Sequence, residues 1–334
     1  GTSTNVSAST GVAVYNRDIE VLAGDMVKVA GVDLSSNSFA TTRALDVVGD
    51  YAYVGSNYQG SNELDVFDIS DPTNPVVVGG FSDTDNFTSL VVSGNYLYST
   101  HETAASYSYE VYDISNPTTP TQVGGADTVS TATDLAVVGN YAYFTSGYSS
   151  TDFEIFDISD PVNIRKVGNY DYAGGMNGVA VVGNYAYVTT NEDGFGILDI
   201  SDPTSPLPLS VASIDGGGWK VVVSGKFAYV TSYGGADNLE IIDISNPNAP
   251  VKVGGAPADG DPSDIEVAGN YAYVTSDTTG DEVEVFDISD PTNPFKVGGA
   301  SVSDVANSIK IHDGYLYVVS DYVGDDFSIY KLPT

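Results

Sequence analysis

Residues 134–168 of this chain read D-L-A-V-V-G-N-Y-A-Y-F-T-S-G-Y-S-S-T-D-F-E-I-F-D-I-S-D-P-V-N-I-R-K-V-G, and near-copies of this stretch fill most of the remaining sequence. A Y-A-Y element or a close variant starts at seven positions, which are Tyr51, Tyr96, Tyr141, Tyr185, Phe227, Tyr271 and Tyr315. A D-I-S element starts, in steps of 45, 44, 42, 44 and 44 residues, at Asp68, Asp113, Asp157, Asp199, Asp243 and Asp287. Self-similarity at a fixed period of this length is the signature of a repeat architecture.

Each repeat contains four predicted β-strands, because apolar residues alternate with polar ones over short runs that end at turn residues. In the quoted copy the first strand covers 135–138 and the second 141–144, joined by a G-N turn that tolerates the positive φ of a tight hairpin. The third covers 153–158 and the fourth 164–168, separated by S-D-P-V-N, in which the proline presets φ. Four short antiparallel strands repeated seven times predict an all-β fold, a seven-bladed β-propeller.

The chain starts inside a repeat. V-K-V-A-G from Val27 matches V-K-V-G-G from Val251, so Val27 begins a fourth strand with no first three strands before it. The missing three are found at 308–332. We therefore expect the N-terminal strand to complete the last blade, which removes an open sheet edge. The predicted parts are an N-terminal arm, 1–25, and a propeller, 26–334.

The third strand of the repeats, with its closing Asp, reads E-L-D-V-F-D, Y-E-V-Y-D, F-E-I-F-D, F-G-I-L-D, L-E-I-I-D and V-E-V-F-D. In these residues the chain resembles the LVIVD-repeat β-propellers, from about Met26 to the C-terminus. The seventh copy departs from the pattern, because it reads F-S-I-Y-K, with Lys331 where Asp is expected. The resemblance implies a bacterial or archaeal surface or secreted protein, mostly without an assigned activity, and it supplies no catalytic residues. The expected location is extracellular, at the cell surface.

The composition argues against several classes of partner. Asp and Glu total 45 against 11 Lys and Arg, a formal net charge of -34. Nucleic acid and anionic lipid both need clustered basic residues, so neither is expected to bind. The chain has no cysteine, which excludes disulfides and thiolate metal sites, and no apolar run of 18 residues, which argues against a membrane span. Salt or divalent ions are expected to stabilise the fold by easing self-repulsion.

The N-terminal residues carry the features expected of an exported chain after processing. The sequence opens with a Ser/Thr-rich tail and no basic and apolar leader, so either a signal peptide has been removed or there never was one. The family resemblance and the composition favour removal. Two N-x-S/T sequons, at Asn5 and Asn86, permit glycosylation but also arise often by chance.

The arm has no place in any predicted blade. It contains two β-like runs, Val12–Tyr15 and Ile19–Leu22. One expectation is that Ile19–Leu22 adds a fifth strand to the last blade. The other is that the arm pairs with the sheet edge of a neighbouring molecule, which produces a homopolymer or filament if the contact does not close on itself. The residues expected to make this intermolecular contact are Val12, Ala13, Val14, Tyr15, Ile19 and Val21.

The loops between second and third strands vary from copy to copy, and in a propeller they share one face with the connections between successive repeats. Two of these connections stand out, Y-D-Y-A-G-G-M-N-G with Tyr170 and Tyr172, and D-G-G-G-W-K with Trp219, the single tryptophan. Exposed aromatic residues are common anchors for a carbohydrate or a surface protein. The alternative is that the glycines let a tight loop pass near the channel and Trp219 caps the core.

Catalytic patterns are absent from the sequence. The two histidines, His101 and His312, lie in different repeats and share no spacing with a serine or aspartate that a catalytic triad needs. His101 beside Glu102 offers a metal ligand or proton carrier, although an isolated histidine usually serves neither role. No esterase, zinc-protease or phosphate-loop motif occurs. We expect no enzymatic activity; a hydrolase with paired carboxylates ranks third among the hypotheses.

Calcium is the one cofactor for which the sequence offers ligands, because hard cations prefer clustered oxygen atoms. The candidate group is D-G-D-P-S-D, with Asp259, Asp261 and Asp264, and none of the acidic groups follows the EF-hand pattern. The recurrent Asp of D-I-S is interpreted instead as a residue that fastens a turn. The leading hypothesis is a non-enzymatic structural subunit joined through its arm, and the alternative is a binding or adhesion propeller that uses the variable-loop face.

Overall fold

The computed structural model describes most of the chain. For the first two segments below, only the backbone is described. The described residues are 12–15, 18–21, 26–34, 41–57, 63–82, 86–101, 108–128, 131–147, 151–172, 174–192, 194–277, 280–302, 305–321 and 324–333.

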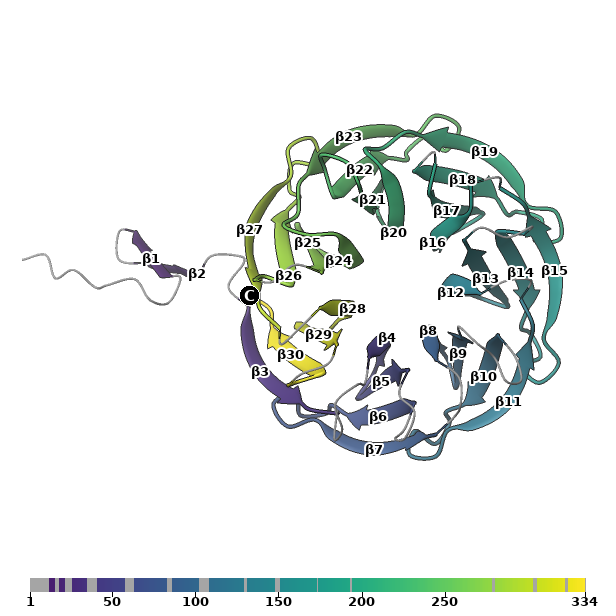
Figure 1. The fold of residues 1–334 in the computed structure, drawn as a ribbon, viewed down its shortest axis with the longest axis horizontal. Helices are drawn as coiled ribbons and strands as arrows, with labels where there is room; N and C mark the ends of the chain where they lie inside the picture. The colour runs from purple at the N-terminus through teal and green to yellow at the C-terminus, as the bar shows by residue number, and fades with distance from the viewer. Residues whose placement is uncertain are drawn as a thin grey trace, which may run out of the picture.

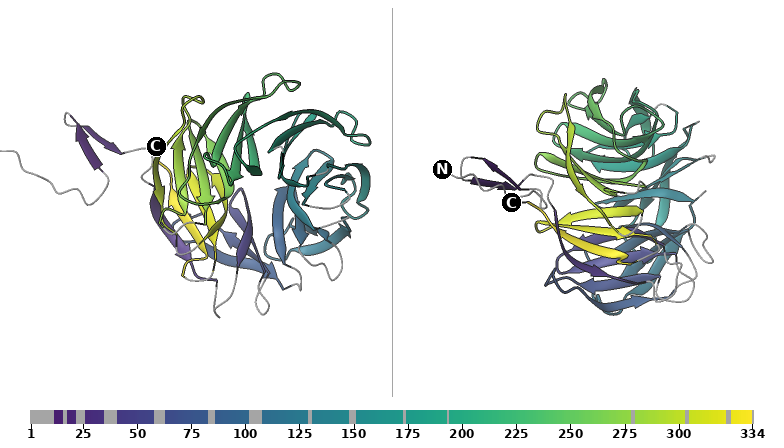
Figure 2. Two further views of the ribbon diagram at one scale, coloured as in Figure 1. Left: turned by 45° about the horizontal axis from the view of Figure 1, so that its top comes forward. Right: turned by 60° about the vertical axis from the view of Figure 1, so that its left-hand side comes forward.

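Seven four-stranded antiparallel sheets stand in a ring around a central channel in the described residues (Figure 1), so the predicted seven-bladed propeller is confirmed. Figure 2 shows that the ring has the form of a thick disc. The described residues contain no helix long and apolar enough to span a membrane. The innermost strands are β4 (Thr42–Val48), β8 (Phe87–Ser93), β12 (Ala132–Val138), β16 (Met176–Val182), β20 (Gly217–Ser224), β24 (Pro262–Ala268) and β28 (Ala306–His312).

The other strands of each blade follow outward in order. The second strands are β5 (Tyr51–Ser56), β9 (Tyr96–His101), β13 (Tyr141–Ser146), β17 (Tyr185–Thr190), β21 (Phe227–Tyr233), β25 (Tyr271–Ser276) and β29 (Tyr315–Ser320). The third are β6 (Leu64–Asp68), β10 (Tyr109–Asp113), β14 (Phe153–Asp157), β18 (Phe195–Asp199), β22 (Leu239–Asp243), β26 (Val283–Asp287) and β30 (Phe327–Lys331). The outermost are β7 (Val76–Phe81), β11 (Thr121–Ala126), β15 (Arg165–Tyr170), β19 (Leu207–Ala212), β23 (Val251–Ala256), β27 (Phe295–Ala300) and β3 (Val27–Val32).

The N-terminal strand closes the ring as predicted. The last blade has the order β28-β29-β30-β3, and β3 runs antiparallel to β30 from the pair Val27 and Lys331 to the pair Val32 and Phe327. An isolated bridge between Thr41 and Asp321 links this blade to the first. Every blade therefore has its fourth strand.

The arm forms a separate hairpin. β1 (Val12–Tyr15) pairs with β2 (Asp18–Val21), and the two strands make a sheet of their own. The expectation of a fifth strand on the last blade is wrong, because that blade contains four strands and β2 pairs with β1 alone. The side chains of Val12, Ala13, Val14, Tyr15, Ile19 and Val21 lie outside the described residues, as does Asn5, so pairing with another molecule stays a prediction.

The core lies between neighbouring blades. Successive side chains of a strand point to opposite faces, and in the middle strands of each blade both sets are buried, so each sheet packs against a neighbouring sheet on both faces. Phe144 of β13 and Phe156 of β14 are fully buried and meet edge to face at 5.3 Å, and Tyr109 of the preceding blade lies 4.5 Å from Phe144. Each such side chain contributes about 2–3 kcal/mol on burial. The ring is held together mainly by these contacts.

The D-I-S turns are fastened by their aspartates, as the sequence predicts. Asp157 Oδ1 accepts hydrogen bonds from the backbone N–H of Ser159 at 3.0 Å and from its hydroxyl at 2.6 Å, and the hydrogen bonds from Ser159 and Arg165 lower the pKa of Asp157 to about 2. The backbone contact recurs at Asp68, Asp113, Asp199, Asp243 and Asp287.

The outermost strands carry a glycine where the next blade approaches. A Cβ atom at Gly168 would lie 2.1 Å from the carbonyl oxygen of Pro203, and one at Gly124 would lie 2.1 Å from that of Pro161. Ser210 stands at the corresponding position of β19, and its hydroxyl donates to the carbonyl of Pro247 at 2.6 Å. The proline turn of one blade therefore rests on the outermost strand of the blade before it.

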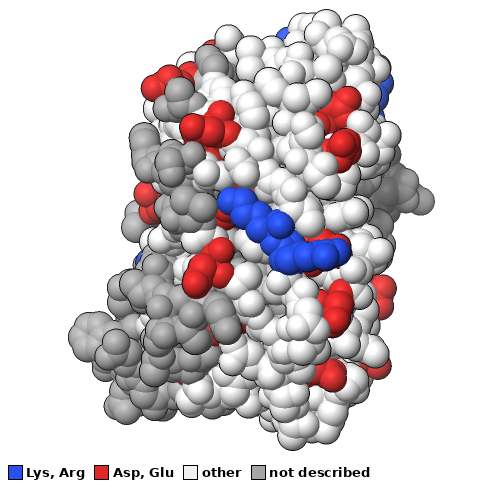
Figure 3. Space-filling view, turned by 90° about the vertical axis from the view of Figure 1, so that its right-hand side faces the viewer, with Lys and Arg blue, Asp and Glu red and all other residues white. Residues whose placement is uncertain are grey.

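Figure 3 views the side of the ring that carries β15, where one strip of basic side chains crosses a surface with separate acidic groups. The basic residues of β15 are Arg165, which pairs with Asp157 at 3.0 Å, and Lys166, which pairs with Glu154. The high net charge is thus spread over the rim in this view and is not gathered into one patch.

Candidate functional site

A β-bulge occurs near the start of every innermost strand and brings seven side chains to the mouth of the channel. In each blade the register between the first two strands shifts at this point, and a bulge re-aims the side chain of the extra residue. The observed strand β12 therefore starts three residues before the predicted one. We call the bulged residues the mouth ring: Arg43, Thr88, Thr133, Asn177, Trp219, Ser263 and Asn307.

Most of the mouth ring is used to tie neighbouring blades together. In five blades the side chain of the ring residue donates a hydrogen bond to a backbone carbonyl at the start of the next innermost strand. The pairs are Thr88 to Ala132 at 3.2 Å, Thr133 to Met176 at 3.0 Å, Asn177 to Gly218 at 2.8 Å, Ser263 to Ala306, and Asn307 to Thr42 at 2.8 Å. Short polar residues recur here because they reach that carbonyl without filling the opening.

Trp219 departs from this pattern. Its Nε1 donates to the carbonyl of Ser263 at 3.0 Å, one residue beyond the usual acceptor position, and its ring meets Tyr233 at 6.3 Å in an edge-to-face arrangement. The side chain remains 39% exposed, so it does not cap the core, and that part of the alternative from the sequence is wrong. Trp219 is an exposed aromatic ring with a fixed orientation.

The glycines before Trp219 make room for Tyr233. A Cβ atom at Gly217 would lie 2.6 Å from the Tyr233 ring, and one at Gly216 would lie 2.1 Å from the Tyr233 carbonyl oxygen. The Tyr233 hydroxyl donates to Oδ1 of Asn191 at 2.7 Å, and Nδ2 of Asn177 donates to the same oxygen at 2.8 Å. The sequence D-G-G-G-W-K thus builds a supported platform, which lowers the entropy lost when a ligand binds.

A cavity of about 270 Å³ opens at the channel mouth beside this platform. Its walls combine the indole of Trp219, two cations, and short polar residues from four other blades. The lining residues are Arg43, Thr88, Thr131, Ala132, Thr133, Trp219, Lys220, Ser263 and Asn307.

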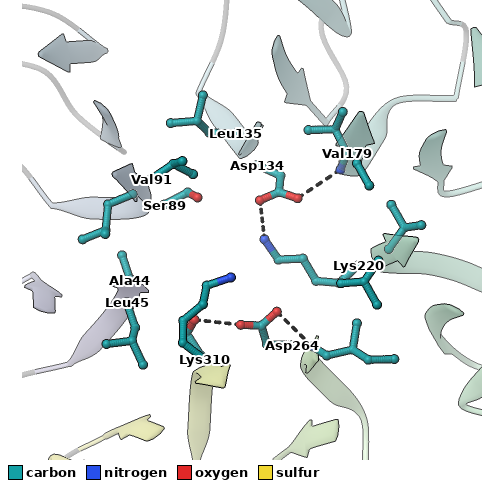
Figure 4. Close-up of a pocket in the computed structure, with 16 residues that line it drawn as sticks. Ala44, Leu45, Ser89, Val91, Asp134, Leu135, Val179, Lys220, Asp264 and Lys310 are labelled. Atoms are coloured by element: carbon teal, nitrogen blue, oxygen red, sulfur yellow. Dashed lines mark hydrogen bonds and ion pairs between the residues drawn. The ribbon is translucent and has the colours of Figure 1, made fainter. Parts of the chain in front are cut away.

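A second cavity, of about 210 Å³, lies within the channel and shares Lys220 with the first (Figure 4). Nζ of Lys220 donates to Asp134 Oδ1 across the channel at 2.6 Å, and Nζ of Lys310 donates to Glu266 at 2.8 Å. Figure 4 shows both ammonium groups directed into the channel. The channel therefore carries ion-paired lysines among mainly apolar lining residues.

The channel carboxylates are held largely by backbone donors of neighbouring blades. Asp46 accepts from the N–H of Val92 at 2.7 Å, and Asp134 accepts from the N–H of Val179 at 3.0 Å. Burial raises the pKa of Asp46, although Lys310 opposes that shift. Burial acts to lower the pKa of Lys310, but the surrounding carboxylates outweigh it and hold that pKa above its usual value.

Tyr170 and Tyr172 do not join Trp219. Both are partly buried and pack on the core between the third and fourth blades, where Tyr170 is the last residue of the outermost strand β15. From the sequence we predicted that all three residues lie on the variable-loop face, because each belongs to a connection between the fourth strand of one repeat and the first strand of the next. The structure shows that only Trp219 reaches the channel.

The three calcium candidates do not form one group. Nζ of Lys296 pairs with the Asp259 carboxylate at 2.7 Å, and the backbone N–H of Asp261 donates a hydrogen bond to Asp277. Asp264 faces the channel, where it accepts hydrogen bonds from the Ser308 hydroxyl and the Ile309 N–H. Among the described residues, one group of three carboxylates lies close enough to hold a cation, and sequence reasoning missed it because its members come from two segments more than 20 residues apart. It comprises Asp215, Asp237 and Glu240, and Nζ of Lys252 lies within 3.1 Å of each.

His101 lies in a fully buried polar cluster. Its Nε2 contacts Ser99 Oγ at 2.9 Å and Glu110 Oε2 at 3.6 Å, and all three side chains are inaccessible. A triad needs serine and acid on opposite nitrogens of the imidazole, whereas both partners here approach the same nitrogen. Glu102 lies outside the described residues. His312, in a different blade, pairs with the exposed Asp313 at 3.5 Å.

Comparisons with known proteins agree with this architecture. Solved structures similar in fold include the β-propeller domain of Cps50 (Swd1) from Myceliophteria thermophila, with a TM-score of 0.71, 11% identity, and coverage of 92% of this chain and 100% of that one. A chain of the mitotic checkpoint complex has a TM-score of 0.69, 10% identity, and coverage of 100% and 99%. The computationally designed Ika8 protein has a TM-score of 0.62, 10% identity, and coverage of 92% and 100%. At these identities the likeness concerns the fold alone.

A comparison with curated protein sequences gives no match. The family model of the LVIVD repeat matches the chain six times and together covers most of it. The matched residues are 41–83, 86–128, 130–172, 173–210, 215–255 and 259–300. The suspected resemblance is confirmed: the chain belongs to the LVIVD repeat family.

Proposed function

We propose that this protein is an exported, non-enzymatic binding propeller whose channel mouth takes a carbohydrate ligand. A propeller of LVIVD repeats is a binding or interaction scaffold. The observation that carries the proposal is Trp219, an exposed indole held by Ser263 and Tyr233 beside a cavity of about 270 Å³. Flat, preorganised aromatic rings bordered by polar groups suit a sugar, which presents an apolar ring face and a polar rim.

The non-enzymatic part of the proposal is supported by the sequence, which carries none of the hydrolase motifs considered above. It is supported also by the geometry at His101, where serine and glutamate share one imidazole nitrogen. The export is supported by the acidic composition, rich in Ser and Thr, and by the family resemblance.

The test is a screen on a glycan array with the full chain and with Trp219→Ala. The proposal expects binding to at least one class of glycan, which the substitution reduces by a factor of ten or more, since burying a large apolar side chain contributes about 1.5–3 kcal/mol. Phe295→Ala is the matched control, because Phe295 is another exposed aromatic residue, 52% accessible, on the outermost strand β27. Equal glycan binding by the Trp219 variant and the full chain would overturn the proposal.

A second candidate function is self-assembly through the arm. The observation that favours it is the completeness of the ring, since seven sheets have four strands each without β1 and β2. A chain lacking residues 1–25 is then expected to stay a folded monomer while the full chain forms oligomers or filaments. Light scattering and electron microscopy of the two samples decide the matter, and assembly by the shortened chain would count against it.

A further inference from the structure

Basic residues are concentrated in the channel of this acidic protein. Among the described residues, three cations line the channel or its mouth, against four acids, whereas the whole chain carries 11 basic and 45 acidic residues. By their positions along the innermost strands the three cations stand at successive depths, with Arg43 in the mouth ring, Lys220 one residue after it and Lys310 three residues after it. The four acids are Asp46, Asp134, Asp264 and Glu266.

The lysines retain hydrogen-bonding capacity toward the cavity. An ammonium group has three donors. In the described residues Lys220 has Asp134 as its one carboxylate partner, and Lys310 has Glu266. Both ammonium groups point into the channel space in Figure 4. An anionic group that reaches Lys220 therefore finds donors that the protein has not used.

The channel acids have their acceptors largely occupied. Asp264 accepts from the N–H of Ile265 at 2.9 Å, from the N–H of Ile309 at 3.0 Å and from the hydroxyl of Ser308 at 2.7 Å. Asp46 accepts from two backbone N–H groups. Asp46 and Glu266 also surround Lys310 at the deeper level, so an anion is repelled there and meets the ammonium group of Lys220 first.

Trp219 and Lys220 are consecutive residues that line the same mouth cavity, and Arg43 lines it from the first blade. The aromatic platform and the ammonium group thus stand at one wall, with a guanidinium group from another blade. At about 270 Å³ the cavity is just below the range of drug-sized pockets, about 300–1,000 Å³, which suits a small ligand such as a single sugar residue. Short hydroxyl and amide side chains form the rest of the wall, which suits a polyol better than an apolar peptide side chain.

We propose that the ligand of the channel mouth is an acidic sugar residue, whose ring stacks on Trp219 and whose carboxylate pairs with Lys220 and Arg43. This inference rests on the proposed function and adds the chemical class of the ligand. A charge-assisted hydrogen bond to a carboxylate distinguishes an acidic sugar from its neutral ester, because the ester accepts a weaker bond and carries no charge.

The probes are trisaccharides containing galacturonate, glucuronate or N-acetylneuraminate, each compared with its methyl ester by calorimetry on the full chain. We expect at least one acid to bind tenfold or more tightly than its ester. Lys220→Gln and Arg43→Gln are expected each to remove that preference. Arg165→Gln is the control, because Arg165 is an exposed rim cation with 74% side-chain accessibility and is expected to leave the preference unchanged.

The outcomes separate the two proposals. If an ester binds as tightly as its acid and Trp219→Ala still abolishes binding, the acidic class is wrong and the carbohydrate function stands. If none of the three acids binds, the acidic class is also overturned, and neutral glycans on the array then decide the function. Should Lys220→Gln unfold the protein, Arg43→Gln, at an exposed position, provides the same comparison.

Discussion

Lys252 neutralises part of the acidic charge of this protein, because one ammonium group pairs with three carboxylates. Its ammonium group lies 2.6 Å from Glu240, a fully buried carboxylate, and close to Asp215 and Asp237. Lys296 repeats the arrangement in the next blade with Glu284, Asp259 and Asp281. In both blades a lysine occupies the position that a bound cation would otherwise take.

Lys252→Met is expected to lower the free energy of unfolding by about 2–3 kcal/mol, because it leaves a buried carboxylate without its counter-charge. Millimolar calcium is expected to restore part of that loss, since the three carboxylates lie within 4.8 Å of one another. Thermal unfolding with and without calcium measures both effects. Lys226→Met is the control, because Lys226 is 62% exposed and pairs with Asp243 at 3.6 Å. If Lys252→Met unfolds at the same temperature as the unchanged protein and calcium does not alter that temperature, this explanation is wrong.

Stability is expected to pass through a maximum below neutral pH. Burial raises the pKa of Asp46, Glu240 and Glu266, so the folded state gains protons first and is stabilised as the pH falls toward those values. The turn aspartates behave oppositely. Hydrogen bonds from Ser159 lower the pKa of Asp157 to about 2, so its contribution is complete above the unfolded pKa of about 3.9 and is lost as the pH falls through the folded value.

Urea unfolding between pH 7 and pH 2 measures this profile. We expect the midpoint concentration to rise first and to decrease below about pH 4, where the turn aspartates take up protons. A midpoint that decreases steadily from pH 7 would show that the buried carboxylates do not have raised pKa values.

At the scale of the element, two local features, a β-bulge and a glycine, determine how strands of neighbouring blades contact one another. The bulge in each innermost strand turns one side chain to the channel mouth, and the glycine in most outermost strands receives the proline turn of the next blade. The sequence predicted the strands through their apolar alternation. It did not predict the mouth ring, because Thr133 and Asp134 interrupt that alternation and place the expected start of the strand at Leu135.

Gly168→Val is expected to lower the free energy of unfolding by about 1–3 kcal/mol, because a side chain there overlaps the carbonyl of Pro203. Gly196→Ala is the matched control. A Cβ at Gly196 would lie 3.4 Å from Val188, an ordinary contact, so this change is expected to be neutral or slightly stabilising. Denaturant unfolding of the two variants compares them. If Gly168→Val and Gly196→Ala are equally stable, the contact between Gly168 and Pro203 does not constrain the distance between the two blades.

At the scale of the whole molecule, the repeat explains why the fold could be predicted and the site only in part. Seven copies of one pattern specify seven blades, and the match of Val27 to Val251 specifies the closing strand. The sequence pointed to Trp219 because it is the single tryptophan and follows three glycines. Its support by Tyr233 was not predicted, and neither was the pairing of Lys220 with Asp134, since these contacts depend on how distant segments meet.

We expect the closing strand β3 to be essential for the stability of the ring, and we expect the arm to contribute nothing to it. Removing residues 1–25 should leave the thermal midpoint unchanged. Removing residues 1–33 also deletes β3, exposes the edge of β30 and should produce a less stable protein that associates through that edge. Thermal unfolding and light scattering on both chains test this. If the shorter chain is as stable as the longer one, closure by β3 contributes nothing to the ring.

The pairing of β3 with β30 also constrains how the chain acquires its fold on the ribosome. Six blades are each made from contiguous sequence and can form in the order of their synthesis. The last blade needs the first and last strands of the propeller together, which are separated by about 300 residues, so at roughly 5–20 residues per second β3 waits on the order of 15–60 s for its partner. During that interval the nascent chain is an open arc with an unpaired strand at its front, and its exposure to chaperones or to neighbouring chains is greatest then.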